Sequence, residues 1–188
     1  MKTLIIFAHT FWEDSKANKA LFESIKNSKQ VQIHNLSEIY KEGKIDVSKE
    51  MALLKNADKI IFQFPLFWFS TPALLKEWQD RVLTAILYGE NKELLKDKKF
   101  QIVTTLGGAQ ESYDGHHGAT LEELLKPICY AFEYLGCKSL KPFAIFSADA
   151  NKLFKSLSRR YKSKFRVFLN TFYKFKKMLT TYKKFLKL

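Results

Sequence analysis

Short apolar runs alternate along this chain with segments in which apolar residues recur every three or four positions. The apolar runs predict strands at Thr3–Ala8, Val31–Asn35, Lys59–Phe64, Phe100–Thr105 and Leu140–Ser147. The wider spacing predicts helices at Ser15–Lys26, Val47–Asn56, Pro72–Val82 and Thr120–Leu135. Strands that alternate with helices indicate an α/β fold with a parallel sheet covered on both faces.

Five strands in this rhythm fit the flavodoxin-like strand order 2-1-3-4-5, in which strands one, three and four are neighbours. A group of polar, aromatic or glycine residues follows each of these three strands. In open α/β sheets, ligands bind at the carboxyl ends of the strands. The topology therefore predicts that the three groups line one shared site.

The first group is His9 with Ser15, Lys16 and Asn18. The last three lie around the start of the first helix, where unpaired N–H groups and the helix dipole favour an anion such as phosphate. A structural interpretation also stands for each residue alone, because Ser15 can simply cap the helix and His9 can be a partly buried polar residue with one hydrogen bond.

The second group is the loop between Pro65 and Pro72, which carries three consecutive aromatic residues, Phe67, Trp68 and Phe69. Neither proline allows the sheet to continue or a helix to start early. Aromatic side chains at a strand end are typical of a site for a flat ligand or a partner. The alternative is that the loop completes the core.

The third group is Gly107–Gly108, which lets the backbone approach a ligand and donate N–H groups, although most such pairs are turns. No Gly-x-Gly-x-x-Gly follows any predicted strand, and no glycine-rich P-loop is present. These absences argue against a nicotinamide-binding Rossmann domain and against most nucleotide triphosphatases.

Composition and length favour one domain without a membrane span. A chain of 188 residues with 46% hydrophobic residues can bury one substantial core. We expect the amino terminus to be the first strand rather than a signal peptide, which places the protein in the cytoplasm. Cys129 and Cys137 are eight apart and match neither a redox pair nor a zinc spacing, so we expect core thiols and no metal site.

Charge separates the carboxyl-terminal fifth from the rest. Residues 151–188 hold 13 of the 32 Lys and Arg and none of the 19 Asp and Glu, so residues 1–150 are formally neutral. Apolar positions recur three or four apart along one side of a predicted long helix: Phe154, Leu157, Tyr161, Phe165, Phe168, Phe172, Phe175, Leu179, Tyr182 and Leu186. We expect its first part to pack on the domain.

Such a basic amphipathic helix suits an anionic membrane surface at the inner face of the cytoplasmic membrane, or an integral membrane transporter. The alternative is a purely structural or dimer-forming helix. Nucleic-acid binding is disfavoured, because the segment is strongly amphipathic and no nucleic-acid motif precedes it.

The same residues carry a family resemblance over about residues 1–146. The chain resembles the NAD(P)H:quinone oxidoreductases of the flavodoxin-like fold, and within them the small bacterial branch that includes the ancillary flavoprotein subunits of glutathione-gated potassium efflux systems. The motifs are Ala8-His9, Ser15-x-x-Asn18, Pro65-Leu66-x-Trp68-Phe69-x-x-Pro72 and Thr105-x-Gly107-Gly108.

The resemblance implies a flavin-binding domain in residues 1–150, with FMN favoured over FAD because the chain is short. It implies that the flavin phosphate and ribityl chain are held by His9, Ser15, Lys16, Ala17 and Asn18. It implies that the isoalloxazine ring is lined by Pro65, Leu66, Phe67 and Trp68, and that its polar edge is completed by Thr105, Leu106, Gly107 and Gly108. Leu106 departs from the pattern, since relatives often have a hydroxyl residue there.

The implied reaction is hydride transfer from NAD(P)H, as co-substrate, through the flavin to a quinone-type acceptor. Tyr113 and His117 match the residues that assist hydride transfer in the family, and His116 competes with His117. The resemblance also implies a homodimer, because related sites are completed by a second subunit. The alternative function is a regulatory subunit of a potassium efflux transporter with secondary reductase activity.

Overall fold

A parallel sheet in the order β2-β1-β3-β4-β5 forms the centre of the protein, and β6 also pairs with β4. The computed structural model describes residues 1–25, 27–148 and 165–186. The strands are β1 (Thr3–Phe7), β2 (Val31–Asn35), β3 (Lys59–Pro65), β4 (Lys99–Thr105), β5 (Lys138–Ser139) and β6 (Phe143–Ile145). The predicted fold class and strand order are confirmed.

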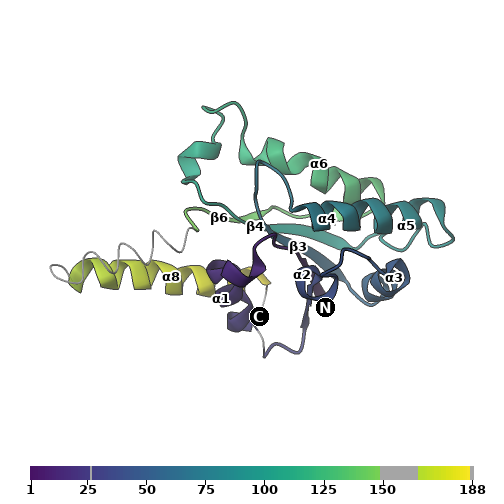
Figure 1. Ribbon diagram of the computed structural model, residues 1–188, viewed down its shortest axis with the longest axis horizontal. Coiled ribbons are helices and arrows are strands. Elements are labelled where there is room, and N and C mark those ends of the chain that lie inside the picture. The colour runs from purple at the N-terminus through teal and green to yellow at the C-terminus, as the bar shows by residue number, and fades with distance from the viewer. Residues whose placement is uncertain (26, 149–164, 187–188) are drawn as a thin grey trace.

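Helices cover both faces of this sheet (Figure 1). The α-helices are α1 (Lys16–Ile25), α2 (Leu36–Ile39), α3 (Val47–Lys55), α4 (Ala73–Trp78), α5 (Thr84–Tyr88), α6 (Leu121–Tyr134) and α8 (Phe165–Leu186). A π-helical turn, η2 (Gln79–Leu83), joins α4 to α5, and the 3-10 turns η1 (Trp12–Asp14) and η3 (Gln110–Tyr113) lie in loops. The sequence predicts Pro72 in the first turn of this helix, but Pro72 is the N-cap of α4, one residue before the first helical residue.

Alternation along the strands divides the core into two layers. Ile60, Phe62 and Phe64 of β3 pack with α3, α4 and α6, whereas Ile61 packs with α1 and α8. Successive side chains of a strand point to opposite faces, so a central strand must be apolar on both. This is why Ile60, Ile61 and Phe62 follow one another in β3 without a polar residue between them.

The sequence predicts one fifth strand over Leu140–Ser147, but the structure has two short strands here, β5 and β6. Ser139 pairs with Phe100, but Phe143 pairs with Val103, so three residues on one strand face two on the other. This one-residue bulge contains Pro142, which has no N–H for the ladder. The side-chain amide of Gln101 donates to the carbonyl of Lys141 at 2.6 Å and satisfies a group that the bulge leaves out of the ladder.

The last turns of α8 pack on the sheet beside α1, and in Figure 1 the first turns of this yellow-green helix project beyond the sheet. Tyr182 and Leu186 are buried there, and Leu179 is half-buried. The residues from Asn151 to Lys164, on which the expectation about the first part of the segment rests, lie outside the described residues. Within the described ranges, no helix has the length and the apolar run that crossing a bilayer requires.

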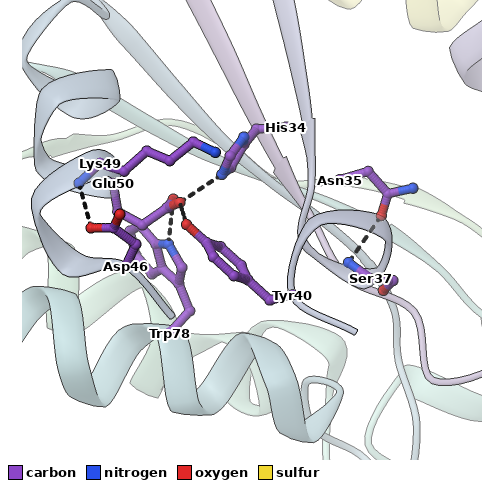
Figure 2. Close-up of polar contacts among 8 residues, drawn as sticks. All are labelled: His34, Asn35, Ser37, Tyr40, Asp46, Lys49, Glu50 and Trp78. Carbon is purple, nitrogen blue, oxygen red and sulfur yellow. Dashed lines mark hydrogen bonds and ion pairs between the residues drawn. The ribbon is translucent and has the colours of Figure 1, made fainter. Parts of the chain in front are cut away.

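A fully buried carboxylate, Glu50 of α3, receives three hydrogen bonds on the α3 and α4 face (Figure 2). Its Oε1 accepts from the Tyr40 hydroxyl at 2.5 Å and lies 2.8 Å from His34 Nε2. Its Oε2 accepts from Trp78 Nε1 at 2.8 Å. A buried charge is tolerated only when it is paired in this way. The cluster therefore ties β2, α3 and α4 together.

Two opposing effects set the pKa of Glu50. Burial raises the pKa, but the hydrogen bonds from His34, Tyr40 and Trp78 outweigh burial and hold it below its ordinary value of 4.5. Because the folded pKa is the lower one, the stabilisation is present above the unfolded pKa and is lost as pH falls through the folded pKa.

We expect Glu50→Gln to lower the free energy of unfolding at pH 7 by about 1.5–3 kcal/mol, because the variant replaces charge-assisted hydrogen bonds with neutral ones. We also expect the unaltered protein to lose stability below about pH 4.5, and the variant to lose less of it over the same interval. Urea unfolding at pH 7 and pH 4 measures both effects.

The matched control is Glu42→Gln, which changes an exposed glutamate and should leave the unfolding curve unchanged at both pH values. Equal stability of Glu50→Gln and the unaltered protein at pH 7 would contradict the stabilising role of the carboxylate.

Candidate functional site

A cavity of about 230 Å³ lies at the carboxyl ends of β1, β3 and β4. It is lined by His9, Asp14, Ser15, Lys16, Ala17, Asn18, Pro65, Leu66, Phe67, Thr105, Leu106, Gly107 and Ala148. Residues from all three sequence groups therefore meet in one place. Two of the residues predicted to bind a cofactor, Trp68 and Gly108, do not line this cavity.

The start of α1 forms one wall of the cavity. Ser15 and Asn18 are buried there, Ala17 is half-buried and Lys16 is exposed. The first turn of a helix leaves backbone N–H groups without intrahelical partners and carries the positive end of the helix dipole. No acidic residue lies in the first turn of α1, although exposed Asp14 lines the same wall. This wall suits an anionic group.

His9 follows β1 and is held in one orientation. Its Nδ1 accepts a hydrogen bond from the N–H of Phe11 at 3.0 Å, and its backbone N–H donates to Ser37 Oγ at 2.8 Å. Burial lowers the pKa of the imidazole, opposed in part by Asp14. A neutral imidazole whose Nδ1 accepts must carry its proton on Nε2. His9 can therefore donate one hydrogen bond through Nε2.

The loop after β3 supplies the apolar part of the cavity. Leu66 is buried, and its N–H donates to the Thr105 carbonyl at 2.9 Å, which extends the pairing of β3 with β4. The ring of Phe67 lies edge-on to His9, with 5.5 Å between ring centroids. These contacts give the cavity a rigid aromatic side beside its polar wall.

Trp68 and Phe69 form a tight two-residue turn that projects from the protein. Phe67 and Ser70 exchange both backbone hydrogen bonds, at 3.1 and 3.0 Å, and the two central residues have φ of 46° and 63°. Two positive φ values in a two-residue hairpin are typical of a type I′ turn, which normally needs Asn and Gly. Bulky residues are strained there, yet both rings stay exposed, at 93% for Trp68 and 61% for Phe69.

The loop after β4 closes the opposite side of the cavity. Leu106 is buried, and its N–H donates to the Ile145 carbonyl at 2.9 Å. A β-carbon at Gly108 would lie 3.0 Å from the Tyr113 ring, so the absence of a side chain at Gly108 lets this ring approach the backbone. Gly107 is exposed, and a β-carbon built on it would have no other atom within 4 Å.

The structure brings Tyr113 near the site but gives it no place in the cavity wall. The Tyr113 ring packs against Gly108 and Phe146, with 5.9 Å between the ring centroids of Tyr113 and Phe146. His117 is exposed, and His116 Nδ1 lies 2.7 Å from Asp114 Oδ1. The roles of Tyr113 and His117 stay predictions, as do those of the proposed cofactor-binding residues.

Two residues of the cavity wall, Asp14 and Ala148, are not among those predicted from the sequence. Asp14 lies in η1, a turn that no apolar periodicity announces. Ala148 reaches the wall because its N–H donates to the Leu106 carbonyl at 2.8 Å, a contact that depends on the bulged fifth strand. The one signal in the sequence that could have identified Asp14 is its position directly before Ser15, where the predicted helix begins.

A larger groove of about 530 Å³ lies between the α4–α5 helical segment and α6. Its apolar wall includes Leu83, Leu87, Ile128, Tyr130, Ala131 and Tyr134. Ser70 and Thr71 also line it, next to the turn that exposes Trp68 and Phe69. One end of the groove therefore adjoins the aromatic turn.

Comparison with known proteins identifies relatives of this architecture. Residues 1–165 match the sequence profile of a protein family described by its flavodoxin-like fold. A glutathione-regulated potassium-efflux system ancillary protein, KefF, from Enterobacter sp. strain 638 is 36% identical over 165 residues, which are 86% of this chain and 93% of the relative.

Two crystal structures are similar over most of both chains. General stress protein 14 of Treponema denticola, in complex with FMN, has a TM-score of 0.76 and 28% identity, and the match covers 97% of this chain and 99% of that one. An NADPH-quinone reductase from P. pentosaceus has a TM-score of 0.71 and 28% identity, with 87% and 99% covered.

Relief of strain at the aromatic turn should stabilise the protein. We expect the double change Trp68→Asn and Phe69→Gly to raise the free energy of unfolding by roughly 1–3 kcal/mol, because these residues adopt positive φ at little cost. Urea unfolding of the protein without added ligands measures the change. The matched control, Trp68→Ala with Phe69→Ala, removes both rings but keeps the strain and should give no gain, so an equal gain in both variants would contradict the strain.

Proposed function

Since the chain belongs to the flavodoxin-like fold family, we propose that it is an FMN-dependent NAD(P)H oxidoreductase that reduces a quinone-type acceptor. The observation that carries the proposal is the cavity at the carboxyl ends of β1, β3 and β4, where the start of α1 meets an aromatic loop and a glycine loop. The similarity to an FMN complex and to an NADPH-quinone reductase supports it.

The residues present fit FMN in three respects. The start of α1 with Lys16 offers backbone N–H groups and positive charge for a phosphate. Leu66 and Phe67 offer an apolar surface for a flat ring. Buried Asn18 and Thr105 offer polar atoms at the edge of the cavity between these two regions. The site thus matches a ligand with an anionic end and an aromatic end.

When bound, FMN supplies the hydride and electron transfer that no side chain of the protein can perform. His9 would hold a cofactor oxygen through Nε2–H, and Ser15, Lys16, Ala17 and Asn18 would hold the phosphate and ribityl chain. Pro65, Leu66, Phe67 and Trp68 would bound the ring and exclude water, and Thr105, Leu106, Gly107 and Gly108 would hold its polar edge.

Tyr113 and His117 would act on the acceptor. The Tyr113 hydroxyl would donate a hydrogen bond to an acceptor oxygen, and the His117 imidazole would supply a proton. Both follow the glycine loop, and the packing of the Tyr113 ring on Gly108, next to the cavity residue Gly107, supports this role.

Similarity to a potassium-efflux ancillary protein favours a second candidate function, a regulatory flavoprotein subunit of a transporter whose reductase activity is secondary. The two functions separate in an assay of NAD(P)H-dependent quinone reduction with and without the transporter. Full turnover by the protein alone supports the oxidoreductase, and turnover that depends on the transporter supports the subunit.

We also propose that the protein forms a homodimer through the face that joins the groove and the aromatic turn. Exposed aromatic side chains concentrate there, namely those of Trp68, Phe69, Tyr130 and Tyr134. A contiguous apolar surface on a soluble domain is typical of an interface. A second copy seated there would lie next to the cavity.

The exposed lysines of α8 support binding to the inner face of the cytoplasmic membrane. Lys176, Lys177, Lys183 and Lys184 are exposed, while Tyr182 and Leu186 face the sheet. The apolar side of these last turns is already occupied by the core, so the contact with lipid would be electrostatic, at about 1 kcal/mol for each lysine near an anionic surface.

The oxidoreductase proposal predicts a yellow purified protein whose released cofactor has the mass of FMN, and which oxidises NADH or NADPH with a quinone. We expect His117→Ala to slow quinone reduction by about 100-fold and Tyr113→Phe by about tenfold, while flavin content is retained. His116→Ala tests the competing candidate: unchanged turnover there assigns the role to His117, whereas a loss in His116→Ala without one in His117→Ala would assign it to His116. Absence of FMN binding by the purified protein would overturn the proposal. Full turnover in both His117→Ala and Tyr113→Phe would remove the catalytic roles of these two residues.

The membrane proposal predicts that the protein binds vesicles of phosphatidylserine and phosphatidylcholine and that added salt weakens this binding. Changing these four lysines of α8 to glutamine should lower binding by roughly 1,000-fold, whereas vesicles of pure phosphatidylcholine should bind neither protein. Absence of binding by the unaltered protein would contradict lipid binding, and binding only to membranes that contain the transporter would assign the lysines to that partner.

A further inference from the structure

Four buried polar side chains form one hydrogen-bonded chain from α8 to the cavity. The Tyr182 hydroxyl donates to Gln63 Oε1 at 2.6 Å, and Gln63 Nε2 donates to Asn18 Oδ1 at 3.0 Å. Asn18 Nδ2 then donates to Thr105 Oγ1 at 3.3 Å. Tyr182 and Gln63 are 0% exposed, and only Asn18 and Thr105 line the cavity. The chain thus joins α8, β3, α1 and β4.

The direction of this chain decides what Thr105 offers to a ligand. Each amide has one donor side and one acceptor side, so a reversal of Gln63 forces a reversal of Asn18. In the observed direction Asn18 donates to Thr105, which leaves the Thr105 hydroxyl proton for a second partner. In the reverse direction Thr105 would give that proton to Asn18 and would face the cavity as an acceptor.

Tyr182 selects the direction from the far end. Its hydroxyl lies in the core, where burial raises its pKa and keeps the proton on the oxygen. Among the described residues, the one hydrogen bond of this hydroxyl goes to Gln63. A phenol that donates to Gln63 requires the acceptor side of that amide, and the order of donors is then fixed as far as Thr105.

We propose that Tyr182 is a positioning residue for the cofactor site, which orients Gln63 and Asn18 so that Thr105 presents a hydroxyl donor to an acceptor atom of the flavin. This inference rests on the proposed FMN site. By linkage, a cofactor that binds the ordered chain also stabilises the docking of α8, since the same hydrogen bonds hold both ends.

Replacement of Tyr182 by phenylalanine keeps the ring and removes the donor. We expect Tyr182→Phe to weaken FMN binding by about three- to tenfold, the effect of one lost hydrogen bond, when apoprotein is titrated with FMN and flavin fluorescence is followed. Thr105→Val should weaken binding by a similar factor. In the Thr105→Val background, Tyr182→Phe should have no further effect, because the donor that it orients is absent.

Two controls separate orientation from general loosening of α8. Tyr88→Phe removes a hydroxyl from an exposed tyrosine on α5 and should leave FMN affinity unchanged. Leu186→Ala removes a buried side chain of α8 without touching the chain of hydrogen bonds. The positioning role would be overturned if the losses of FMN affinity in Leu186→Ala and Tyr182→Phe simply followed their losses of thermal stability. It would also be overturned if Tyr182→Phe kept its full effect on FMN affinity in the Thr105→Val background.

Hydrogen exchange gives a readout that does not need the Tyr182 variant to fold. FMN should slow amide exchange in residues 176–186 of the unaltered protein and of Thr105→Ser, and slow it less in Thr105→Val. If the unaltered protein and Tyr182→Phe bind FMN with equal affinity, this inference is overturned and the proposed function stands. No FMN binding by the unaltered protein would overturn the proposed function and the inference with it.

Discussion

The parallel pairing of β1, β3 and β4 is the constraint on which the site depends. Phe7 pairs with Gln63, and Pro65 pairs with Thr105, so the three strands end at nearly the same level. Neighbouring strands lie about 4.8 Å apart. The loops that follow must therefore share one edge, and residues separated by almost a hundred positions in the sequence line one cavity.

Polar groups buried on the two faces of this sheet behave differently. On the α3 and α4 face, Glu50 receives all its hydrogen bonds from core residues, and none of the four side chains lines the cavity. On the α1 and α8 face, the chain that begins at Tyr182 ends at Thr105, inside the cavity wall. Both sets obey the rule that buried polar groups are paired. The first set ties elements of the core to one another, whereas the second joins the core to the cavity wall.

Sequence periodicity was sufficient for the strand order, and together with one topological rule it predicted that the three groups of residues meet at one edge of the sheet. It could not predict the bulge at Pro142, since the register of β6 depends on pairing with β4. It also could not predict the role of Tyr182, which is one more apolar position in a helical pattern until tertiary contacts bring it to Gln63. Long-range hydrogen bonds leave no trace in local spacing.

Backbone strain is concentrated beside the cavity. Four non-glycine residues of the described chain have positive φ: Trp68, Phe69, Asp97 and Ser147. Asp97 lies in a remote turn and is a residue type that tolerates this conformation. The other three lie in loops that follow β3 and β6, and the Ser147 N–H donates to the Gly108 carbonyl at 2.8 Å. Since nothing in the local sequence favours positive φ for tryptophan or phenylalanine, the surrounding fold must impose it. Strain in three residues of the described chain that lie at one edge of the sheet is typical of a functional site.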